Sequence, residues 1–185
     1  SSGYGGRMLG GLTSNLRYHY TGIDPNTKTY NGLVALGELM TGLGLGSGYE
    51  MHHMPSEQFT PEPGYYDAAF SSPPYFNLET YTDEDTQCMN SCSNLDQWFE
   101  QYVTPTISML HTALANDGLY AVNIADYKDG KEEFKIVDRW KQVSEDIGFT
   151  YVKQLDMLLN VRPGVGNGKL ENSYKAEGIY IFKKS

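Results

Sequence analysis

Tyr66-Asp-Ala-Ala-Phe-Ser-Ser-Pro-Pro-Tyr-Phe76 decides the fold of this 185-residue chain. The apolar run Tyr66 to Phe70 predicts a buried strand. Pro73 and Pro74 cannot donate the hydrogen bonds of a strand ladder, so the strand must end before them. The result is a stiff loop at the carboxyl end of a strand, which is where open α/β sheets place their ligands.

The loop Ser72-Pro-Pro-Tyr75 has the chemistry to capture a planar amine. Proline fixes the backbone, so the carbonyls around Pro73 point in one direction, and Tyr75 supplies a flat aromatic surface. Acceptors beside an aromatic platform suit the amino group of a nucleobase. Taken alone, the tetrapeptide is equally typical of a proline-rich surface loop.

A second motif opens the chain and changes this balance. Gly3, Gly5 and Gly6 allow a tight turn and the close approach of a ligand to backbone N–H groups. A helix-compatible segment follows, and then the apolar strand Tyr18 to Ile23, which ends at Asp24. An acidic residue in this place accepts hydrogen bonds from the two ribose hydroxyls in nucleotide-binding α/β folds.

Together the two motifs resemble the amino-methyltransferases, which use S-adenosyl-L-methionine to methylate exocyclic nitrogens of DNA bases. Ser72-Pro-Pro-Tyr75 resembles the family's motif IV, and Ser2 to Arg7 resembles its glycine loop, motif I. The resemblance spans nearly the whole chain. It implies an α/β fold of the class I methyltransferase type, a doubly wound, mostly parallel sheet with an antiparallel edge strand.

The resemblance also implies the roles of individual residues. Ser72, Pro73, Pro74 and Tyr75 would form the catalytic loop, with Tyr75 and Phe76 contacting the substrate base. The cofactor S-adenosyl-L-methionine would be bound by Ser2, Gly3, Gly5, Gly6, Asp24, Pro25 and Glu57.

The chain departs from the family at its start. The family's glycine loop follows a first parallel strand, and here the first strand is missing because the chain begins at the loop. We therefore expect residues 1–185 to form a single catalytic domain that is a segment of a longer chain. Target recognition would then need a missing segment or a partner subunit.

The net charge of −9 is unevenly distributed, with 3 basic and 13 acidic residues before position 121. Proteins that hold nucleic acid by themselves usually carry a basic footprint, so this charge argues against tight, autonomous DNA binding. The candidates for a basic face are Lys128, Lys131, Lys135, Arg162, Lys169 and Lys175.

Ser72 favours one target amine over another. In the resembling family, Ser at this position is associated with N4 of cytosine, and Asp or Asn with N6 of adenine. We therefore expect DNA with N4-cytosine favoured over N6-adenine; an RNA base is the alternative. Neither Cys88 nor Cys92 lies in a Pro-Cys loop, which weighs against methylation at C5 of cytosine.

The two cysteines are the only ones in the chain, and two free thiols are the simplest interpretation, although their spacing leaves a disulfide open. The segment offers too few ligands for zinc, so we expect no metal. Because no apolar run is long enough to span a bilayer, we expect no membrane partner and a cytoplasmic, bacterial or phage-encoded protein.

The sequence is also compatible with two other classes of function. A nicotinamide-dependent oxidoreductase would use the same glycine loop and Asp24, but it leaves the Ser72 loop unexplained. A non-catalytic subunit would bind cofactor or a partner without turnover.

Periodicity predicts the remaining elements. The segment from Phe76 to Ser93 is polar and acidic and predicts a long loop, either a mobile flap over substrate or a disordered excursion. Trp98 and Phe99 are expected in the core. The expected helices are Thr27 to Met40, Asn94 to Gly118 with a kink at Pro105, and Phe134 to Ile147; the expected strands are Tyr49 to Met54, Leu119 to Ala125, Phe149 to Leu159 and Gly178 to Lys183.

Overall fold

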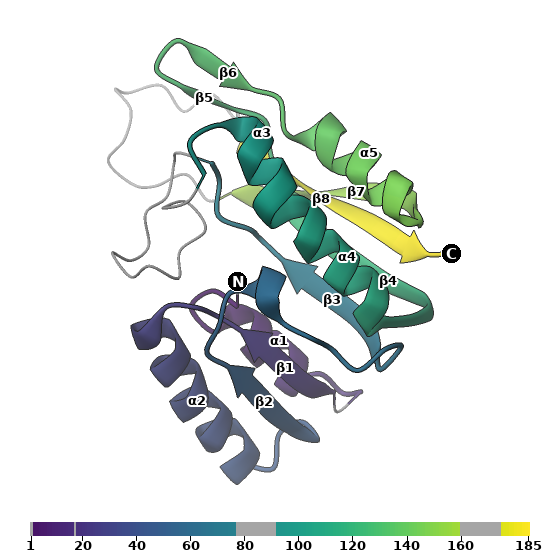
Figure 1. The fold of residues 1–185 in the computed structure, drawn as a ribbon. Coiled ribbons are helices and arrows are strands. Elements are labelled where there is room, and N and C mark those ends of the chain that lie inside the picture. The colour runs from purple at the N-terminus through teal and green to yellow at the C-terminus, as the bar shows by residue number, and fades with distance from the viewer. Residues whose placement is uncertain (1, 17, 77–91, 160–174) are drawn as a thin grey trace.

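The computed structural model describes residues 2–16, 18–76, 92–159 and 175–185. Figure 1 shows these residues as an α/β structure in which helices flank the strands. The expected flap, which falls largely on residues 77–91, lies outside the described residues, as does the connection 160–174 with Arg162 and Lys169.

The N-terminal part alternates helix and strand as predicted. Its elements are α1 (Gly6–Leu12), β1 (His19–Ile23), α2 (Thr27–Gly42), β2 (Gly48–His52) and the 3₁₀ turn η1 (Ser56–Gln58). Helix α2 begins where the sequence predicts, because the Asn26 side chain accepts a hydrogen bond from the Thr29 backbone N–H at 2.9 Å. Strands β1 and β2 pair in parallel.

The C-terminal part builds a four-stranded sheet with the strand order β3-β4-β8-β7. Its strands are β3 (Tyr66–Ser71), β4 (Leu114–Ile124), β7 (Phe149–Leu159) and β8 (Lys175–Lys184). Strands β3 and β4 are parallel, whereas β8 is antiparallel to both of its neighbours. The sheet is mixed, and the predicted antiparallel pair of β7 and β8 at one of its edges is confirmed.

The helical segment before β4 is divided and ends earlier than predicted. It consists of α3 (Leu95–Trp98), a π-helical turn (Phe99–Val103) and α4 (Thr104–Ala113). The π turn precedes Pro105, whose ring nitrogen cannot donate an intrahelical hydrogen bond. The expected end at Gly118 is wrong because β4 starts at Leu114. Asp117, with φ 65°, and Gly118 instead form an irregularity within β4.

Residues 127–134 form a hairpin that the sequence analysis missed. Strands β5 (Tyr127–Asp129) and β6 (Glu132–Phe134) pair in antiparallel fashion, and helix α5 (Val137–Ile147) follows. The predicted helix start at Phe134 is wrong because the Asp126 carboxylate accepts hydrogen bonds from the Ile136 and Val137 N–H groups and fixes the helix start there. The helix ends at Gly148, with φ 111°, as predicted.

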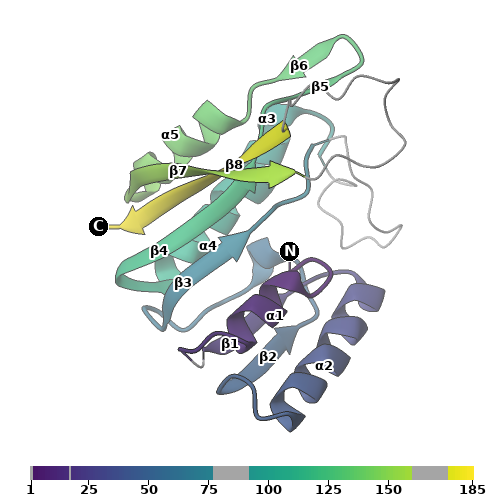
Figure 2. The same cartoon turned by 180° about the vertical axis from the view of Figure 1, so that it is seen from behind.

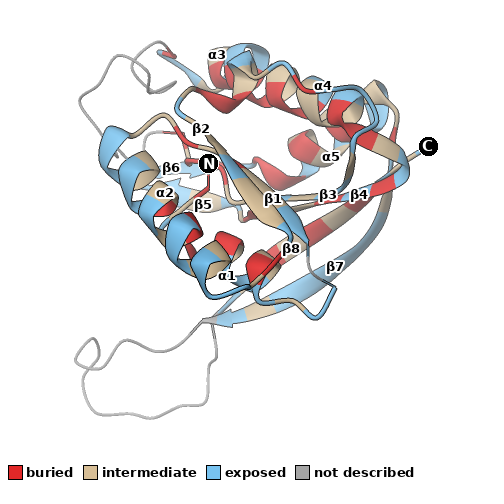
Figure 3. Ribbon diagram, turned by 90° about the horizontal axis from the view of Figure 1, so that it is seen from below, coloured by how far each residue is buried: buried red, intermediate tan, exposed pale blue. Residues whose placement is uncertain are grey.

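The elements are arranged in layers. Helices α3, α4 and α5 lie on one side of the strands, and α1 lies on the other (Figures 2 and 3). The larger core fills the space between the four-stranded sheet and α3 to α5, and it includes Trp98 and Phe99 as predicted. A smaller core joins α1 to α2 through Met8, Leu12 and Leu33.

Strands β1 and β3 each carry a partner on one side only, within the described part of the chain. Strand β1 pairs with β2, and β3 pairs with β4. The expectation that Tyr66 to Phe70 is buried is therefore wrong for part of the strand: Phe70 is 46% exposed, and Asp67 and Ala68 are also exposed. A central parallel strand would be covered, whereas an edge strand is not.

None of the described helices is both long enough and apolar enough to cross a membrane.

Candidate functional site

The glycine loop at residues 2–5 leads directly into helix α1. Gly3 has φ 64°, and Gly5, the N-cap of α1, has φ 97°; both angles are rarely adopted by other residues. A Cβ atom at Gly5 would lie 2.8 Å from Leu36 Cδ2, and one at Gly3 would lie 2.5 Å from an Arg7 guanidinium nitrogen. The space at Gly6 is open, since a Cβ atom there would meet nothing within 4 Å.

Substitution of Gly5 by Ala should destabilise the protein. The left-handed backbone and the contact with Leu36 should together lower the free energy of unfolding by about 1–3 kcal/mol, measured by urea denaturation. Gly10 is the matched control, because it lies inside α1 with open space around it. Gly10→Ala should raise the free energy of unfolding by about 0.5–1 kcal/mol. Equal effects at the two positions would contradict this account of the loop.

Ser2 fastens the glycine loop to the carboxyl end of β1. Its backbone N–H donates to Asp24 Oδ2 at 3.1 Å, and its hydroxyl donates to the Ile23 carbonyl at 3.0 Å. Asp24 is 7% exposed, and its other oxygen accepts from the Asn26 N–H at 3.1 Å. The structure therefore brings Ser2 and Asp24 together, as expected of a shared binding site.

Pro25 and Glu57 lie near the ends of the same pair of strands. The Pro25 carbonyl lies 3.0 Å from Nε2 of His53, whose ring stacks on Tyr30 at 4.8 Å between centroids. Glu57 is half-buried in η1, and its burial raises the pKa of the carboxyl group. Because this carboxyl group is partly shielded from water, a hydrogen bond donated by a ligand would stabilise its charged form.

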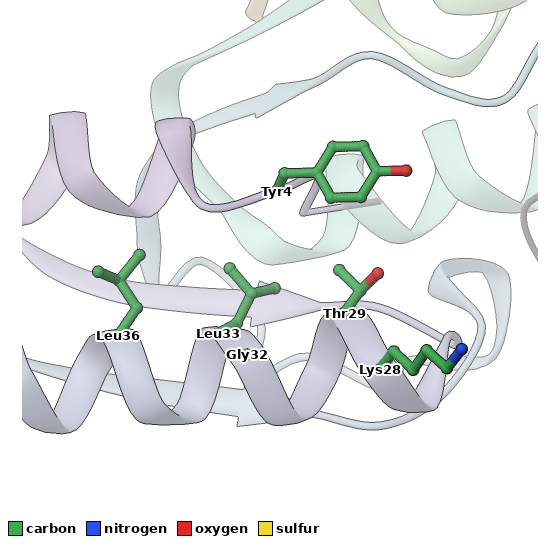
Figure 4. A pocket seen from close by; sticks show the side chains of 6 residues that line it. All are labelled: Tyr4, Lys28, Thr29, Gly32, Leu33 and Leu36. Atoms are coloured by element: carbon green, nitrogen blue, oxygen red, sulfur yellow. The ribbon is translucent and has the colours of Figure 1, made fainter.

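A pocket of about 270 Å³ lies beside the glycine loop. Figure 4 shows the Tyr4 ring on one side of it and a row of α2 side chains on the other. The floor is apolar at Leu33 and Leu36, and Lys28 and Thr29 are polar. Of the glycine loop, only Tyr4 lines it, so the pocket adjoins the predicted cofactor residues without containing them.

Arg7 connects the glycine loop to the strand that carries the catalytic loop. Its guanidinium carbon lies 5.4 Å from the centroid of the Phe70 ring, and Phe70 is two residues before Ser72. Through this contact the two predicted motifs, which are about 65 residues apart in sequence, lie on neighbouring elements. Because β1 and β3 point the same way in Figure 1, Asp24, which follows β1, and Ser72, which follows β3, both lie at the carboxyl ends of strands.

In the loop after β3, the first and last residues are more exposed to solvent than the two residues between them. Pro73 and Pro74 are buried, whereas Ser72 and Tyr75 are half-buried. Phe76 is only 3% exposed and belongs to the larger core, with its ring 5.9 Å from that of Phe134. The two side chains of the loop that remain accessible to a ligand are therefore Ser72 and Tyr75.

Tyr127 is a component of this site that sequence reasoning missed. Its ring meets the Tyr75 ring edge-on at 5.2 Å, and its hydroxyl donates to the Phe76 carbonyl. The signal that could have found it is the dipeptide Asp129-Gly130, which is typical of a tight hairpin turn. Gly130 has φ 58°, the left-handed backbone that such turns require.

The candidate basic face is largely neutralised where the structure describes it. Lys128, Lys131 and Lys135 lie on or beside the β5–β6 hairpin, which also carries Asp129, Glu132 and Glu133. Lys135 Nζ lies 3.2 Å from Glu133 and 3.4 Å from Asp126. The hairpin therefore has no net positive charge of its own.

Comparison with known proteins identifies the fold. No family model matches the sequence, and no curated protein matches it. A SAM-dependent methyltransferase of Methanosarcina mazei is 13% identical with a TM-score of 0.60, and the match covers 100% of this chain and 89% of that one. The cyclase SpnF is 10% identical with a TM-score of 0.62, covering 100% and 73%.

A DNA modification methylase of Thermus thermophilus, crystallised with S-adenosyl-L-methionine, also matches. It is 12% identical, with a TM-score of 0.48, and the match covers 90% of this chain. The chain spans 55% of that methylase, and a likeness this weak carries no argument. The stronger matches establish that the chain has the α/β fold of the class I SAM-dependent methyltransferases, which confirms the predicted fold class.

Proposed function

We propose that this protein transfers a methyl group from S-adenosyl-L-methionine to the exocyclic amine of a DNA base. The observation that carries the proposal is the placement of two motifs on one fold. The glycine loop is fastened to Asp24, and the Ser72 loop follows strand β3, whose Phe70 lies under Arg7 of the first motif. The fold alone does not select this reaction, because the cyclase SpnF shares it.

The cofactor would occupy the carboxyl ends of β1 and β2. The Asp24 carboxylate, which accepts from the Ser2 and Asn26 N–H groups, would also accept from the ribose hydroxyls. The glycine loop would hold the methionine end against its backbone, with open space at Gly6. Pro25 and Glu57 would border the adenine. In support, Glu57 has a pKa raised by burial, and a ligand N–H or O–H group would relieve the lost hydration.

The target base would be flipped out of the duplex, because its amine cannot otherwise reach the cofactor. Tyr75 would stack on the base, and Ser72 Oγ and the Pro73 carbonyl would accept hydrogen bonds from the amino group. S-adenosyl-L-methionine, held by the glycine loop and Asp24, would supply the methyl group to the nitrogen and leave as S-adenosylhomocysteine, and the amine would release one proton to water. Positioning and electrostatics would supply most of the rate enhancement.

Phe76 would support the Ser72–Tyr75 loop from its core side. The resemblance implies that Phe76 contacts the substrate base, but its 3% exposure favours a role in holding the loop against the core. Ser72 favours N4 of cytosine over N6 of adenine through the resemblance described above.

The net charge of −9 favours help from another polypeptide in holding the nucleic acid.

We also propose that a further parallel strand, from a preceding segment or a partner subunit, fits between β1 and β3. Both strands lack a partner on their facing sides within the described residues, and a strand there would join the two sheets into one. It would also cover the exposed Phe70. Full activity is therefore expected of the complete natural polypeptide or of its complex.

The experiment is transfer of tritium from labelled S-adenosyl-L-methionine with the complete natural polypeptide. Duplex DNA, single-stranded DNA and RNA are offered separately. Label in DNA supports the proposal, whereas label in RNA alone moves the assignment to an RNA enzyme. Bound cofactor with no label in any polymer counts against the proposal and favours a non-catalytic subunit.

A further inference from the structure

The β5–β6 hairpin places a pair of stacked aromatic rings against the Ser72–Tyr75 loop. Tyr127 and Phe134 face each other across the hairpin, with ring centroids 4.9 Å apart and an interplanar angle of 11°. On the loop side, Tyr127 meets Tyr75 edge-on at 5.2 Å and 84°. An edge-to-face contact fixes the plane of both rings, since the positive edge of one prefers the negative face of the other.

The Tyr127 hydroxyl makes a second contact with the same loop. It donates a hydrogen bond to the carbonyl of Phe76, the residue that follows Tyr75. Burial and the nearby Asp129 raise the pKa of Tyr127, so the hydroxyl keeps its proton and remains a donor at neutral pH. One side chain therefore holds the ring of Tyr75 and the backbone next to it.

The hairpin is itself anchored on its far side. Asp126 Oδ1, adjacent to Tyr127, accepts from the Ile136 N–H at 2.9 Å and the Val137 N–H at 3.0 Å. These bonds join the start of β5 to the start of α5. Tyr127 thus lies on an anchored element, and its contacts add to the restraint that the loop receives from its buried prolines and from Phe76 in the core.

We infer that Tyr127 is a positioning residue, which sets the plane of the Tyr75 ring and so the place where a flipped base stacks. The inference rests on the proposed function for its effect on catalysis. Its effect on the loop is independent of any substrate. Tyr127 lies on an element that neither predicted motif includes.

The first test is hydrogen–deuterium exchange of the Tyr127→Phe variant of the full chain. The substitution keeps the ring and removes only the hydroxyl, so the fold should persist, which an unchanged far-UV circular dichroism spectrum checks. Peptides that span Tyr75 and Phe76 should exchange faster than in the wild type. Tyr151→Phe is the matched control, because Tyr151 also meets an aromatic ring, Phe182, in an edge arrangement at 5.7 Å, but lies on β7.

The second test is kinetic and uses whichever polymer accepts the methyl group. Tyr127→Phe should lower kcat about 3- to 10-fold, the effect of one hydrogen bond, while the dissociation constant of the cofactor stays unchanged. Tyr127→Ala, which also removes the ring contact, should lower kcat further. An unchanged kcat in Tyr127→Phe overturns the inference. If the wild type methylates nothing, the proposed function fails, and the exchange rates alone then decide whether Tyr127 positions the loop.

Discussion

Tyr75→Ala should lower the turnover of methyl transfer about 10- to 100-fold while leaving cofactor affinity nearly unchanged. Stacking of a base on an aromatic ring is worth about 1–3 kcal/mol, and that interaction is lost with the ring. The side chain is half-buried and only partly packed against the core, so its removal should leave the buried prolines in place. Single-turnover kinetics with saturating cofactor measure the effect on the chemical step.

Tyr65 is the matched control for this experiment. It is 57% exposed and lies just before the start of β3, whereas the Ser72 loop follows the end of that strand. Tyr65→Ala should retain wild-type turnover. Equal rates for Tyr75→Ala and the wild type would show that the ring does not stack on the substrate.

Asp24→Asn should weaken the binding of S-adenosyl-L-methionine about 10- to 100-fold. The carboxylate would accept hydrogen bonds from the ribose hydroxyls, and hydrogen bonds to a charged group are worth about 1.5–3 kcal/mol. Isothermal titration calorimetry gives the dissociation constant. Asp67, an exposed acid on β3, is the control, and Asp67→Asn should bind as the wild type does.

A second ligand separates ribose binding from a purely structural role of Asp24. Its oxygens also accept from Ser2 and Asn26, so the substitution could act by loosening the glycine loop. An S-adenosylhomocysteine analogue without the ribose 2′-hydroxyl resolves this. The wild type should bind the analogue more weakly than S-adenosylhomocysteine, and Asp24→Asn should bind both equally. A full preference for the hydroxyl in Asp24→Asn would contradict the ribose contact.

Local signals in the sequence predict much of the fold. Asn26 caps α2 and Gly148 ends α5 because each residue satisfies backbone groups that a helix end leaves free. Strand β7 has the predicted bounds Phe149–Leu159, because Gly148 ends the helix before it and the aromatic and β-branched residues at its start favour a strand. These features depend on neighbours in sequence.

The features that could not be predicted from the sequence depend on contacts between residues that are far apart in the chain. The exposure of Phe70 follows from which strands pair with β3, and the burial of Phe76 follows from the approach of Phe134. Helix α5 starts at Val137, three residues later than its apolar pattern suggests, because Asp126 holds the preceding N–H groups. Tyr127 entered the site for the same reason, since the hairpin turn brings it there. Tertiary contacts decided each of these cases.

The measurement that tests the central claim most directly is mass spectrometry of nucleosides from DNA incubated with the complete natural polypeptide and S-adenosyl-L-methionine carrying a deuterated methyl group. The account predicts a deuterated methyl group on an exocyclic amine, with N4-methylcytosine favoured and N6-methyladenine as the other amine product. Deuterated 5-methylcytosine, or no deuterated methyl group in any base, would contradict it.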